Sequence, residues 1–318
     1  MKKSEPRATQ TGVVWRSTGS WYSVRTGSGD VIPCKLKGKF RLKGLRTTNP
    51  IAVGDRVDFI YDPKTETGVI TGIHERENYV VRKATKLSKS VHIIAANVDQ
   101  VVLIVSLIKP RTSTGFIDRF LVTTEAYHIP ATIVFNKKDL YQEEQFELLN
   151  EYIRVYESAG YDCLVTSAKT GENVERFKTL LKGKLSLLSG HSGVGKSALI
   201  NAVDPALNLK EGEISKYHEK GKHTTTFAEM FSLQFGGRII DTPGIKEFGL
   251  VGFDKYELGQ RFPEFREKMF DCRFNDCLHR SEPGCAVRKA VENGEISAFR
   301  YKNYLNILKD LEEEAEFG

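Results

Sequence analysis

The stretch LSGHSGVGKSALI, residues 188–200, decides the fold of the central part of this chain. Residues 190–197 have the Gly-x-x-x-x-Gly-Lys-Ser spacing of a phosphate-binding loop, and they stand between an apolar strand pattern and a helical pattern. The glycines allow backbone N–H groups to turn towards phosphate oxygens at the positive end of a helix dipole. The stretch therefore predicts an α/β domain that binds the phosphates of a nucleotide.

The first six residues of this loop are expected to surround the phosphates. They are Gly190, His191, Ser192, Gly193, Val194 and Gly195. Lys196 is expected to reach the β- and γ-phosphates and to assist catalysis, and the hydroxyl of Ser197 is expected to hold Mg²⁺.

A base-reading loop is predicted where the apolar strand ATIVF ends, in the residues NKKD at 136–139. The carboxylate of Asp139 can accept hydrogen bonds from N1–H and the 2-amino group of guanine, a pair of donors that adenine lacks. Asn136 suits the purine edge, the stem of Lys137 is expected to cover the face of the ring, and Lys138 completes the contact segment. The loop therefore predicts binding of GTP and GDP rather than ATP.

The segment VTSAKT, residues 165–170, supplies a third motif at the end of a strand. One backbone N–H group from Ser167, Ala168 or Lys169 could meet guanine O6 there. Three such motifs at strand ends indicate one nucleotide site.

Two further segments are expected to respond to the γ-phosphate. Asp241 ends the strand RIID, where its carboxylate can bind Mg²⁺ through water, and Gly244 can present its N–H to the γ-phosphate. One residue of the run Thr224, Thr225 and Thr226 should complete the magnesium shell; we assign Thr225 to the ion, while the choice among the three stays open. A threonine run is also typical of a β-strand edge.

The group that positions the hydrolytic water differs from that of Ras-like enzymes. Ile245 follows Asp-x-x-Gly where those enzymes have a glutamine, and its side chain cannot form hydrogen bonds. His223 directly precedes the threonine run and is the expected catalytic residue beside Lys196 and Gly244, with a group supplied by a partner as the alternative. A solvated loop histidine would look the same in the sequence.

The order of these motifs is rotated. The chain has the base reader first, then Ser-Ala-Lys, the phosphate-binding loop, the threonine run and Asp-x-x-Gly, whereas ordinary GTPases have the base reader after the phosphate-binding loop. Such a circular permutation is physically permissible, because domain termini usually lie close together. It places Asp-x-x-Gly shortly before the C-terminal module, so contacts of Gly244 with the γ-phosphate could reposition that module.

The N-terminal part is basic and is predicted to form short strands. Residues 1–90 hold 18 Lys and Arg against 8 Asp and Glu, whereas the rest of the chain holds 29 against 33. This excess favours a polyanionic partner, although a solvated basic face has the same composition. Five strand-like segments favour an OB-like barrel, which commonly binds nucleic acid; an SH3-like barrel would give the same pattern. The segments are 11–17, 21–26, 30–36, 55–61 and 67–73.

The middle of the chain has the pattern of a parallel sheet. A polar, basic connector at 74–90 leads into apolar runs that alternate with helical patterns, which is typical of a sheet with helices on both faces. The apolar runs are 100–107, 131–136, 162–167 and 184–189, and a β-hairpin is predicted at 230–241.

No apolar run is long enough to span a membrane and no signal peptide is evident, so we expect an unprocessed cytoplasmic protein.

A cysteine cluster marks the C-terminal part. Cys272, Cys277, His279 and Cys285 form a Cys-x4-Cys-x-His-x5-Cys pattern, a closed tetrahedral set of donors that suits one structural Zn²⁺. Free thiols are the alternative, because the spacing is not that of a common zinc finger. The helical segments around the cluster carry basic and aromatic residues that either face a core or contact RNA. Nothing indicates a coiled coil, so we expect a monomer.

Together these features resemble the small ribosomal subunit biogenesis GTPase family, called RsgA, YjeQ or YloQ in bacteria. The resemblance rests on GHSGVGKS, HTTT, DTPG, the cysteine pattern and the permuted order, and it covers essentially the whole chain. It implies an OB domain at 1–73, a circularly permuted GTPase domain at 74–252 and a mostly helical zinc-binding domain at 253–318. It also implies action on the 30S subunit and its 16S rRNA in late maturation, with GTP hydrolysis stimulated by the subunit and linked to release.

Three functional hypotheses are compatible with the residues. The first is a GTPase that is stimulated by RNA or the ribosome and uses hydrolysis as a release switch. The second is a binding module in which GTP only sets a conformation, as Ile245 in place of glutamine would allow. The third is a kinase or ATPase, which would need another base site.

Replacing Asp139 with asparagine tests the base-reading loop. Asp139→Asn should weaken guanine-nucleotide binding by roughly 10- to 100-fold, because an amide that also donates replaces a charged double acceptor. Competition between GTP and ATP for the wild-type and variant proteins measures the change. Equal competition by ATP in the wild type would instead favour the kinase or ATPase hypothesis.

Overall fold

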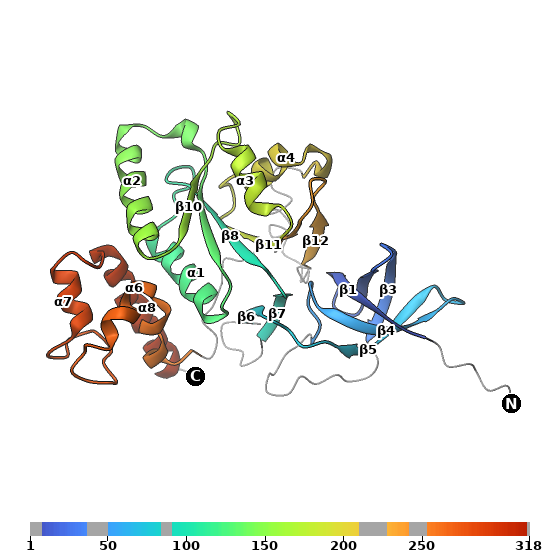
Figure 1. Cartoon of the computed structure of the whole chain (residues 1–318), viewed down its shortest axis with the longest axis horizontal. Helices are drawn as coiled ribbons and strands as arrows, with labels where there is room; N and C mark the ends of the chain where they lie inside the picture. The colour runs from blue at the N-terminus through green and yellow to red at the C-terminus, as the bar shows by residue number, and fades with distance from the viewer. Residues whose placement is uncertain (1–7, 37–49, 84–90, 210–227, 242–252, 317–318) are drawn as a thin grey trace.

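The computed structural model describes residues 8–36, 50–83, 91–209, 228–241 and 253–316. Figure 1 shows three parts in chain order: a β-barrel, an α/β domain and a group of helices at the C-terminus. The fold class expected from the sequence is confirmed in all three parts. Within the described ranges, no helix has the length and apolar character needed to cross a membrane.

The N-terminal strands close into a five-stranded barrel. β1 pairs antiparallel with both β2 and β4, and β3 pairs parallel with β5, so the strand order returns to β1. Alternate side chains, including Val14, Val24, Phe59 and Ile70, are fully buried inside, as the period-2 pattern of the sequence requires. The strands are β1 (Thr9–Ser17), β2 (Tyr22–Thr26), β3 (Val31–Leu36), β4 (Arg56–Asp62) and β5 (Thr67–Ile73).

The connector after the barrel contains a strand that its polar composition did not predict. β6 (Tyr79–Lys83) pairs antiparallel with β7 (Val91–Ala96) in a separate two-stranded sheet. Val80 and Val81 on β6 are buried, so two adjacent apolar residues hold this part of the connector against the protein. Arg76, just before β6, donates to both carboxylate oxygens of the fully buried Asp55 at 2.6 and 2.7 Å and thereby fastens the connector to the barrel.

The α/β domain is built on six strands in the order β10-β9-β8-β11-β13-β12. The first five are parallel, and β12 pairs antiparallel with β13 as the hairpin predicted at 230–241. At its other side β12 meets β1 at the pair Arg16↔Glu229, so the barrel continues the same sheet. The strands are β8 (Gln100–Val105), β9 (Ala131–Phe135), β10 (Asp162–Val165), β11 (Leu185–Ser189), β12 (Glu229–Ser232) and β13 (Arg238–Asp241).

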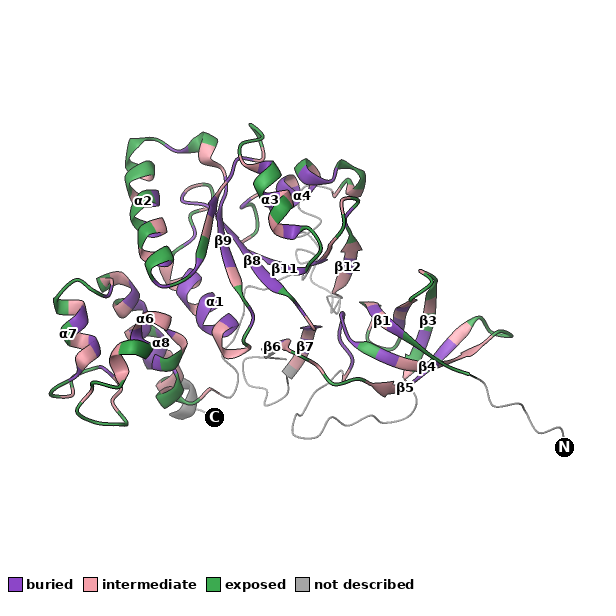
Figure 2. Cartoon of the chain, in the orientation of Figure 1, coloured by how far each residue is buried: buried purple, intermediate pink, exposed green. Residues whose placement is uncertain are grey.

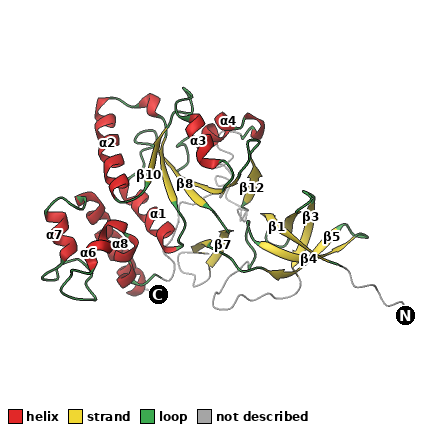
Figure 3. Ribbon diagram, viewed as in Figure 1, coloured by secondary structure: helices red, strands yellow, loops and turns green. Residues whose placement is uncertain are grey.

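Helices cover both faces of this sheet (Figure 3). On β8, Val101, Leu103 and Val105 pack with the first pair of helices, whereas Val102 and Ile104 pack with the second pair. The strands are therefore buried on both sides, as Figure 2 shows, which explains their continuous apolar runs. The first pair is α1 (Thr114–Ala126) and α2 (Glu143–Ser158), and the second pair is α3 (Val174–Leu181) and α4 (Lys196–Val203). Two 3₁₀ turns, η1 (Lys138–Leu140) and η2 (Pro205–Leu207), lie in the connections.

The C-terminal module is helical and packs on α1. The aromatic residues Phe262, Phe265 and Tyr304 are buried in its core together with Val122 of α1, whereas Phe270 is 90% exposed. The sequence left open whether the aromatic residues of this part face a core or contact RNA. These three face the core. The module consists of η3 (Lys255–Glu257), η4 (Gly259–Arg261), α6 (Pro263–Met269), α7 (Ala286–Glu292) and α8 (Ala298–Glu316).

A buried ionic cluster joins this module to the α/β domain. Arg300 of α8 donates from Nη1 to Asp118 of α1 at 2.7 Å, and from Nε and Nη2 to Glu264 at 2.7 and 2.9 Å. Asp118 also accepts from Asn303 at 2.6 Å and from the hydroxyl of Tyr156 at 2.9 Å. Burial raises the pKa of Asp118, and Arg300 acts against that rise. Asp118 and Arg300 are both buried, so each charge is shielded from water. Each one is stabilised by the opposite charge of the other, and removing either would leave an uncompensated buried charge.

We expect Arg300→Met to destabilise the protein strongly. Removing the guanidinium leaves two carboxylates without their cation, and breaking a buried pair in this way costs about 3–5 kcal/mol. Arg119→Met is the matched control, because its ion pair with Asp310 is partly exposed to solvent and should contribute less than the buried pair, about 1 kcal/mol. Urea unfolding measures both; an equal loss of stability in the two variants would contradict this account.

Candidate functional site

The predicted motifs meet at the carboxyl edge of the parallel sheet. β8, β9 and β10 end side by side, since Val105 pairs with Phe135 and Phe135 pairs with Val165. β11 lies on the other side of β8 and leads into loop 190–197. Loops after parallel strands gather at one edge and commonly form ligand sites there. Segments that are far apart in the sequence are therefore neighbours here.

Loop 190–197 requires glycine at two close approaches. Gly190 has φ of 141°, and a Cβ atom there would lie 2.1 Å from the carbonyl oxygen of Ile104. Gly195 has φ of 96°, and a Cβ atom there would lie 2.3 Å from the side-chain nitrogen of Asn136. At both positions the backbone is left-handed and there is no space for a Cβ atom. The loop can therefore lie this close to its neighbours only if both residues are glycine.

The charged residue of this loop is held by the loop itself. Lys196 begins α4 and donates from Nζ to the carbonyl oxygens of Gly190 and His191 at 2.7 and 2.8 Å. Ser197 follows on the same first turn and is buried. The imidazole of His191 lies against the ring of Phe116 on α1, with ring centroids 4.0 Å apart. The loop is therefore fixed both internally and against α1.

Asn136 links the base-reading loop to the phosphate-binding loop. Its side-chain nitrogen donates to the carbonyl oxygen of Val194 at 2.9 Å, and its side-chain oxygen accepts from the hydroxyl of Thr166 at 3.1 Å and from the N–H of Ala168 at 3.3 Å. The residue is 2% exposed. One amide therefore connects three of the motifs that the sequence separates.

The other residues of loop 136–139 are held by neighbours around it. Ser167 donates to the Asp139 carboxylate at 2.6 Å, which leaves further acceptor capacity on that group. Lys137 donates to the carbonyl oxygen of Lys109, and Lys138 pairs with Glu172. Lys169 is exposed and follows Ala168, whose N–H bonds to Asn136. The structure thus brings the residues predicted at 136–139 and 167–169 into one place.

The predicted switch residues are only partly within the described ranges. Asp241 is the last residue of β13, and its backbone pairs with Leu188, two residues before the phosphate-binding loop. Its side chain lies outside the described set. The other predicted switch residues lie outside the described ranges altogether; they are His223, Thr224, Thr225, Thr226 and Gly244.

Two residues around the site were not predicted from the sequence. Thr166 bonds to the Asn136 side chain, and its place directly before Ser-Ala-Lys could have signalled this role. Tyr141 donates from its hydroxyl to the Asn136 carbonyl oxygen at 2.7 Å. No spacing rule in the sequence marks a tyrosine at that position.

The cysteine cluster is assembled in the C-terminal module. The donor atoms of Cys272, Cys277, His279 and Cys285 all lie within 4.8 Å of one another. Nδ1 of His279 is 3.6 Å from the sulfur of Cys272 and 3.4 Å from that of Cys285. The distance between nitrogen and sulfur in a tetrahedral zinc site is about 3.6 Å, given Zn–N and Zn–S bonds of about 2.1 and 2.3 Å. The four residues therefore fit a tetrahedral metal ion.

The protonation chemistry of the cluster also suits a metal ion. Burial lowers the pKa of His279, which favours the neutral imidazole that binds metals. Burial raises the pKa of Cys277 to about 12, so its thiolate needs a nearby cation to form at neutral pH. Tyr301 and Tyr304 of α8 donate to the carbonyl oxygens of His279 and Leu278 at 2.7 and 2.8 Å. These bonds hold the cluster against the module's longest helix.

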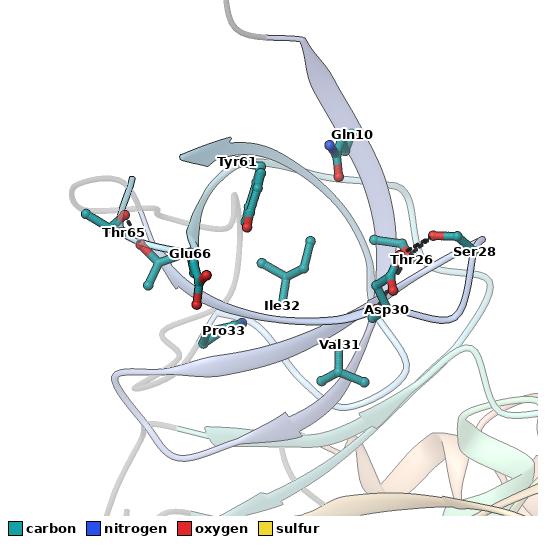
Figure 4. Close-up of a pocket in the computed structure, with 11 residues that line it drawn as sticks. Gln10, Thr26, Ser28, Asp30, Val31, Ile32, Pro33, Tyr61, Thr65 and Glu66 are labelled. Carbon is teal, nitrogen blue, oxygen red and sulfur yellow. Dashed lines mark hydrogen bonds between the residues drawn. The ribbon is translucent and has the colours of Figure 1, made fainter. Parts of the chain in front are cut away.

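The barrel has a cavity of about 770 Å³ between the β2–β3 and β4–β5 turns (Figure 4). Tyr61 lines it together with two carboxylates, Asp30 and Glu66, and Asp30 accepts from the hydroxyl of Ser28 at 2.7 Å. None of the described residues that line it is Lys or Arg. The cavity is therefore a poor site for a phosphate backbone, although the N-terminal part of the chain is basic.

The sheet order and the phosphate-binding loop define a P-loop GTPase with circularly permuted motifs. A family model described as RsgA GTPase matches residues 73–251, and one described as RsgA N-terminal domain matches residues 11–70. The chain belongs to the RsgA GTPase family, and it is a GTP hydrolase.

Similar proteins extend over nearly the whole chain. The small ribosomal subunit biogenesis GTPase RsgA of Christiangramia forsetii is 54% identical over 304 residues, which cover 95% of this chain and 96% of that protein. Small ribosomal subunit biogenesis GTPase RsgA 2 of Bacteroides thetaiotaomicron is 53% identical over 302 residues, which cover 95% of this chain and 97% of that protein.

Two solved structures share the fold. YjeQ from Thermotoga maritima matches with a TM-score of 0.77 and 39% identity, over 96% of this chain and 99% of that one. YloQ, described as a circularly permuted GTPase, matches with a TM-score of 0.72 and 31% identity, over 96% of both chains. The predicted permutation and the predicted family are therefore confirmed.

We expect the purified protein to carry one zinc ion per chain and Cys285→Ser to lose it. Loss of a structural zinc should cost the C-terminal module on the order of several kcal/mol, because metal binding contributes directly to folding. Elemental analysis and thermal unfolding measure the two effects. Cys163→Ser, at an isolated half-buried cysteine of β10, is the control. Full zinc content in the Cys285→Ser protein would rule out this ligand set.

Proposed function

We propose that this chain binds the 30S ribosomal subunit through contacts that include 16S rRNA and assists its late maturation. In this proposal the subunit stimulates GTP hydrolysis, and hydrolysis is linked to release. The observation that carries the proposal is the 54% identity, over 95% of the chain, to a protein named as a small ribosomal subunit biogenesis GTPase. The protein would act as a monomer in the cytoplasm, where ribosomal subunits are available.

The nucleotide site is proposed to use the residues that meet at the sheet edge. Guanine would lie against Asn136, Lys137, Lys138 and Asp139, with the segment 167–169 at O6. The part of Asp139 that Ser167 does not engage is available to the N1–H and 2-amino donors of guanine. Supporting this assignment, Asn136 ties that loop to the phosphate-binding loop at 2.9 Å, so base and phosphate recognition share one rigid frame.

The phosphates and Mg²⁺ are assigned to the loop 190–197 and the switch segments. Lys196, at present bonded to two carbonyl oxygens of its own loop, would exchange those acceptors for phosphate oxygens. Ser197, Thr225 and Asp241 would hold the Mg²⁺, which supplies charge stabilisation to the transferred phosphoryl group. Gly244 would donate its N–H to the γ-phosphate.

His223 is proposed to position the hydrolytic water. The motivation is Ile245, which lacks the hydrogen-bonding groups of the glutamine found in Ras-like enzymes. A histidine can orient water and accept its proton near neutral pH. Stimulation by the subunit would then consist of placing His223 correctly beside the γ-phosphate.

The two flanking modules are proposed as the ribosome-binding parts, with the divisions 1–73, 74–252 and 253–318. The barrel lies in the basic N-terminal region and carries an exposed aromatic residue. Trp21 is 37% exposed, and the ammonium group of Lys35 lies 4.2 Å from its ring centroid. An aromatic face beside a cation can stack on an unpaired RNA base. The zinc ion would hold the C-terminal module in shape.

The decisive experiment is GTP turnover with isolated ribosomal particles. We expect 30S subunits to raise multiple-turnover phosphate release severalfold, and 50S subunits or unrelated RNA to leave it near the basal rate. His223→Ala should reduce the stimulated rate by roughly 100-fold or more, in the range of general acid–base contributions. His218→Ala, in the same sequence segment, is the control and should retain stimulation. An unchanged rate with every particle would refute the proposed stimulation while leaving the GTPase assignment intact.

A further inference from the structure

The hydroxyl of Tyr141 joins two segments beneath the base-reading loop. It donates to the carbonyl oxygen of Asn136 at 2.7 Å and accepts from the backbone N–H of Leu107 at 3.2 Å. The tyrosine is 7% exposed, and its ring meets Phe146 edge-on at a centroid distance of 6.2 Å. Burial raises its pKa, so the hydroxyl keeps its proton and can donate at physiological pH.

The first bond closes the base-reading loop on itself. Asn136 begins the loop and Tyr141 follows the 3₁₀ turn that contains Asp139. Lys137 at the entry to that turn has φ of 66°, a left-handed conformation that is uncommon for a side chain of its size. The bond from Tyr141 to Asn136 spans this turn and limits the positions that the Asp139 carboxylate can adopt.

The second bond connects the loop to the segment after β8. Leu107 opens the segment in which the Lys109 carbonyl accepts from Lys137. The next residue, Pro110, lies close to the phosphate-binding loop, since a Cβ atom at Gly193 would be 3.4 Å from its ring. Tyr141 is thus bonded to a segment that touches both nucleotide loops.

We propose that Tyr141 is a positioning residue that holds Asp139 in register with the base edge of guanine. This proposal rests on the proposed guanine site at 136–139. Phenylalanine would fill the same space, but it would leave the Asn136 carbonyl and the Leu107 N–H buried without this partner. The loop would then relax, and the Asp139 carboxylate would lose its alignment with the N1–H and 2-amino donors of guanine. Of these two hydrogen bonds, only the one to the 2-amino group is absent with hypoxanthine as the base.

The test compares GDP with inosine diphosphate, which is the same nucleotide without the 2-amino group. Titration of the full-length wild-type and Tyr141→Phe proteins gives two dissociation constants each. We expect the variant to lower the ratio of GDP affinity to IDP affinity by roughly three- to tenfold, the change produced by one weakened hydrogen bond. A structural role alone would lower both affinities equally and leave the ratio unchanged.

Tyr161→Phe is the matched control. Tyr161 is also a buried tyrosine of the α/β domain, but its hydroxyl has no hydrogen-bond partner among the described residues. Its removal should keep the wild-type ratio. An equal reduction of the ratio in both variants would overturn the proposal, as would an unchanged ratio in Tyr141→Phe.

The wild-type ratio separates this proposal from the one on which it rests. If the wild-type protein does not prefer GDP over IDP, the guanine assignment of 136–139 fails, and the role of Tyr141 fails with it. If the preference exists and Tyr141→Phe preserves it, only the role of Tyr141 fails. If the Tyr141→Phe variant does not fold, the exchange rate of the Leu107 amide hydrogen in the wild-type protein provides the test. We expect bound GDP to slow this exchange more than bound IDP does. Equal slowing by the two nucleotides would overturn the proposal.

Discussion

The side chain of Asn136 forms the hydrogen bonds on which the geometry of the proposed nucleotide site depends. It bonds to Val194 of the phosphate-binding loop and to Thr166 and Ala168 of the third motif, so one buried amide fixes three loops relative to one another. These loops follow β9, β10 and β11, and they meet because those strands and β8 are parallel neighbours with their carboxyl ends at one edge. The order of the strands along the sequence does not change which loops lie at that edge of the sheet. This is the physical reason why a permuted sequence can build an ordinary GTPase site.

The two flanking modules attach to different parts of the α/β domain. The barrel joins the edge strand β12 through the pair Arg16↔Glu229, and Arg25 adds a hydrogen bond to Ser232 of the same strand at 3.3 Å. The C-terminal module packs on α1, which covers one face of the sheet. Figure 1 shows the two modules at opposite ends of the α/β domain.

The sequence predicted local features well and distant contacts poorly. The barrel strand at 67–73 was predicted with the bounds that the structure has, because alternating burial leaves a period of two in the sequence. The loops 136–139 and 190–197 stood out in the sequence because the chemistry expected of them requires fixed spacings, and their contacts with a nucleotide stay a prediction. Arg300 could not be found in this way: it lies 182 residues from Asp118, and an arginine within a helical pattern is typical of an exposed face. The pairing of β1 with β12 and the hydrogen bonds of Tyr141 likewise leave no periodic signal.

The position of α1 bears on how the nucleotide site could influence the C-terminal module. The ring of Phe116, near the start of α1, packs against the ring of His191 of the phosphate-binding loop, and Asp118, half a turn further on, bonds to Arg300. A reorientation of the module driven from Gly244 would have to break the Arg300 cluster or move α1 with it. Breaking such a cluster costs about 3–5 kcal/mol, and a ligand can shift an equilibrium only by its difference in affinity for the two states. Moving α1 and the module together avoids that cost, and among the described residues the contact between the rings of Phe116 and His191 would link such a movement to the phosphate-binding loop.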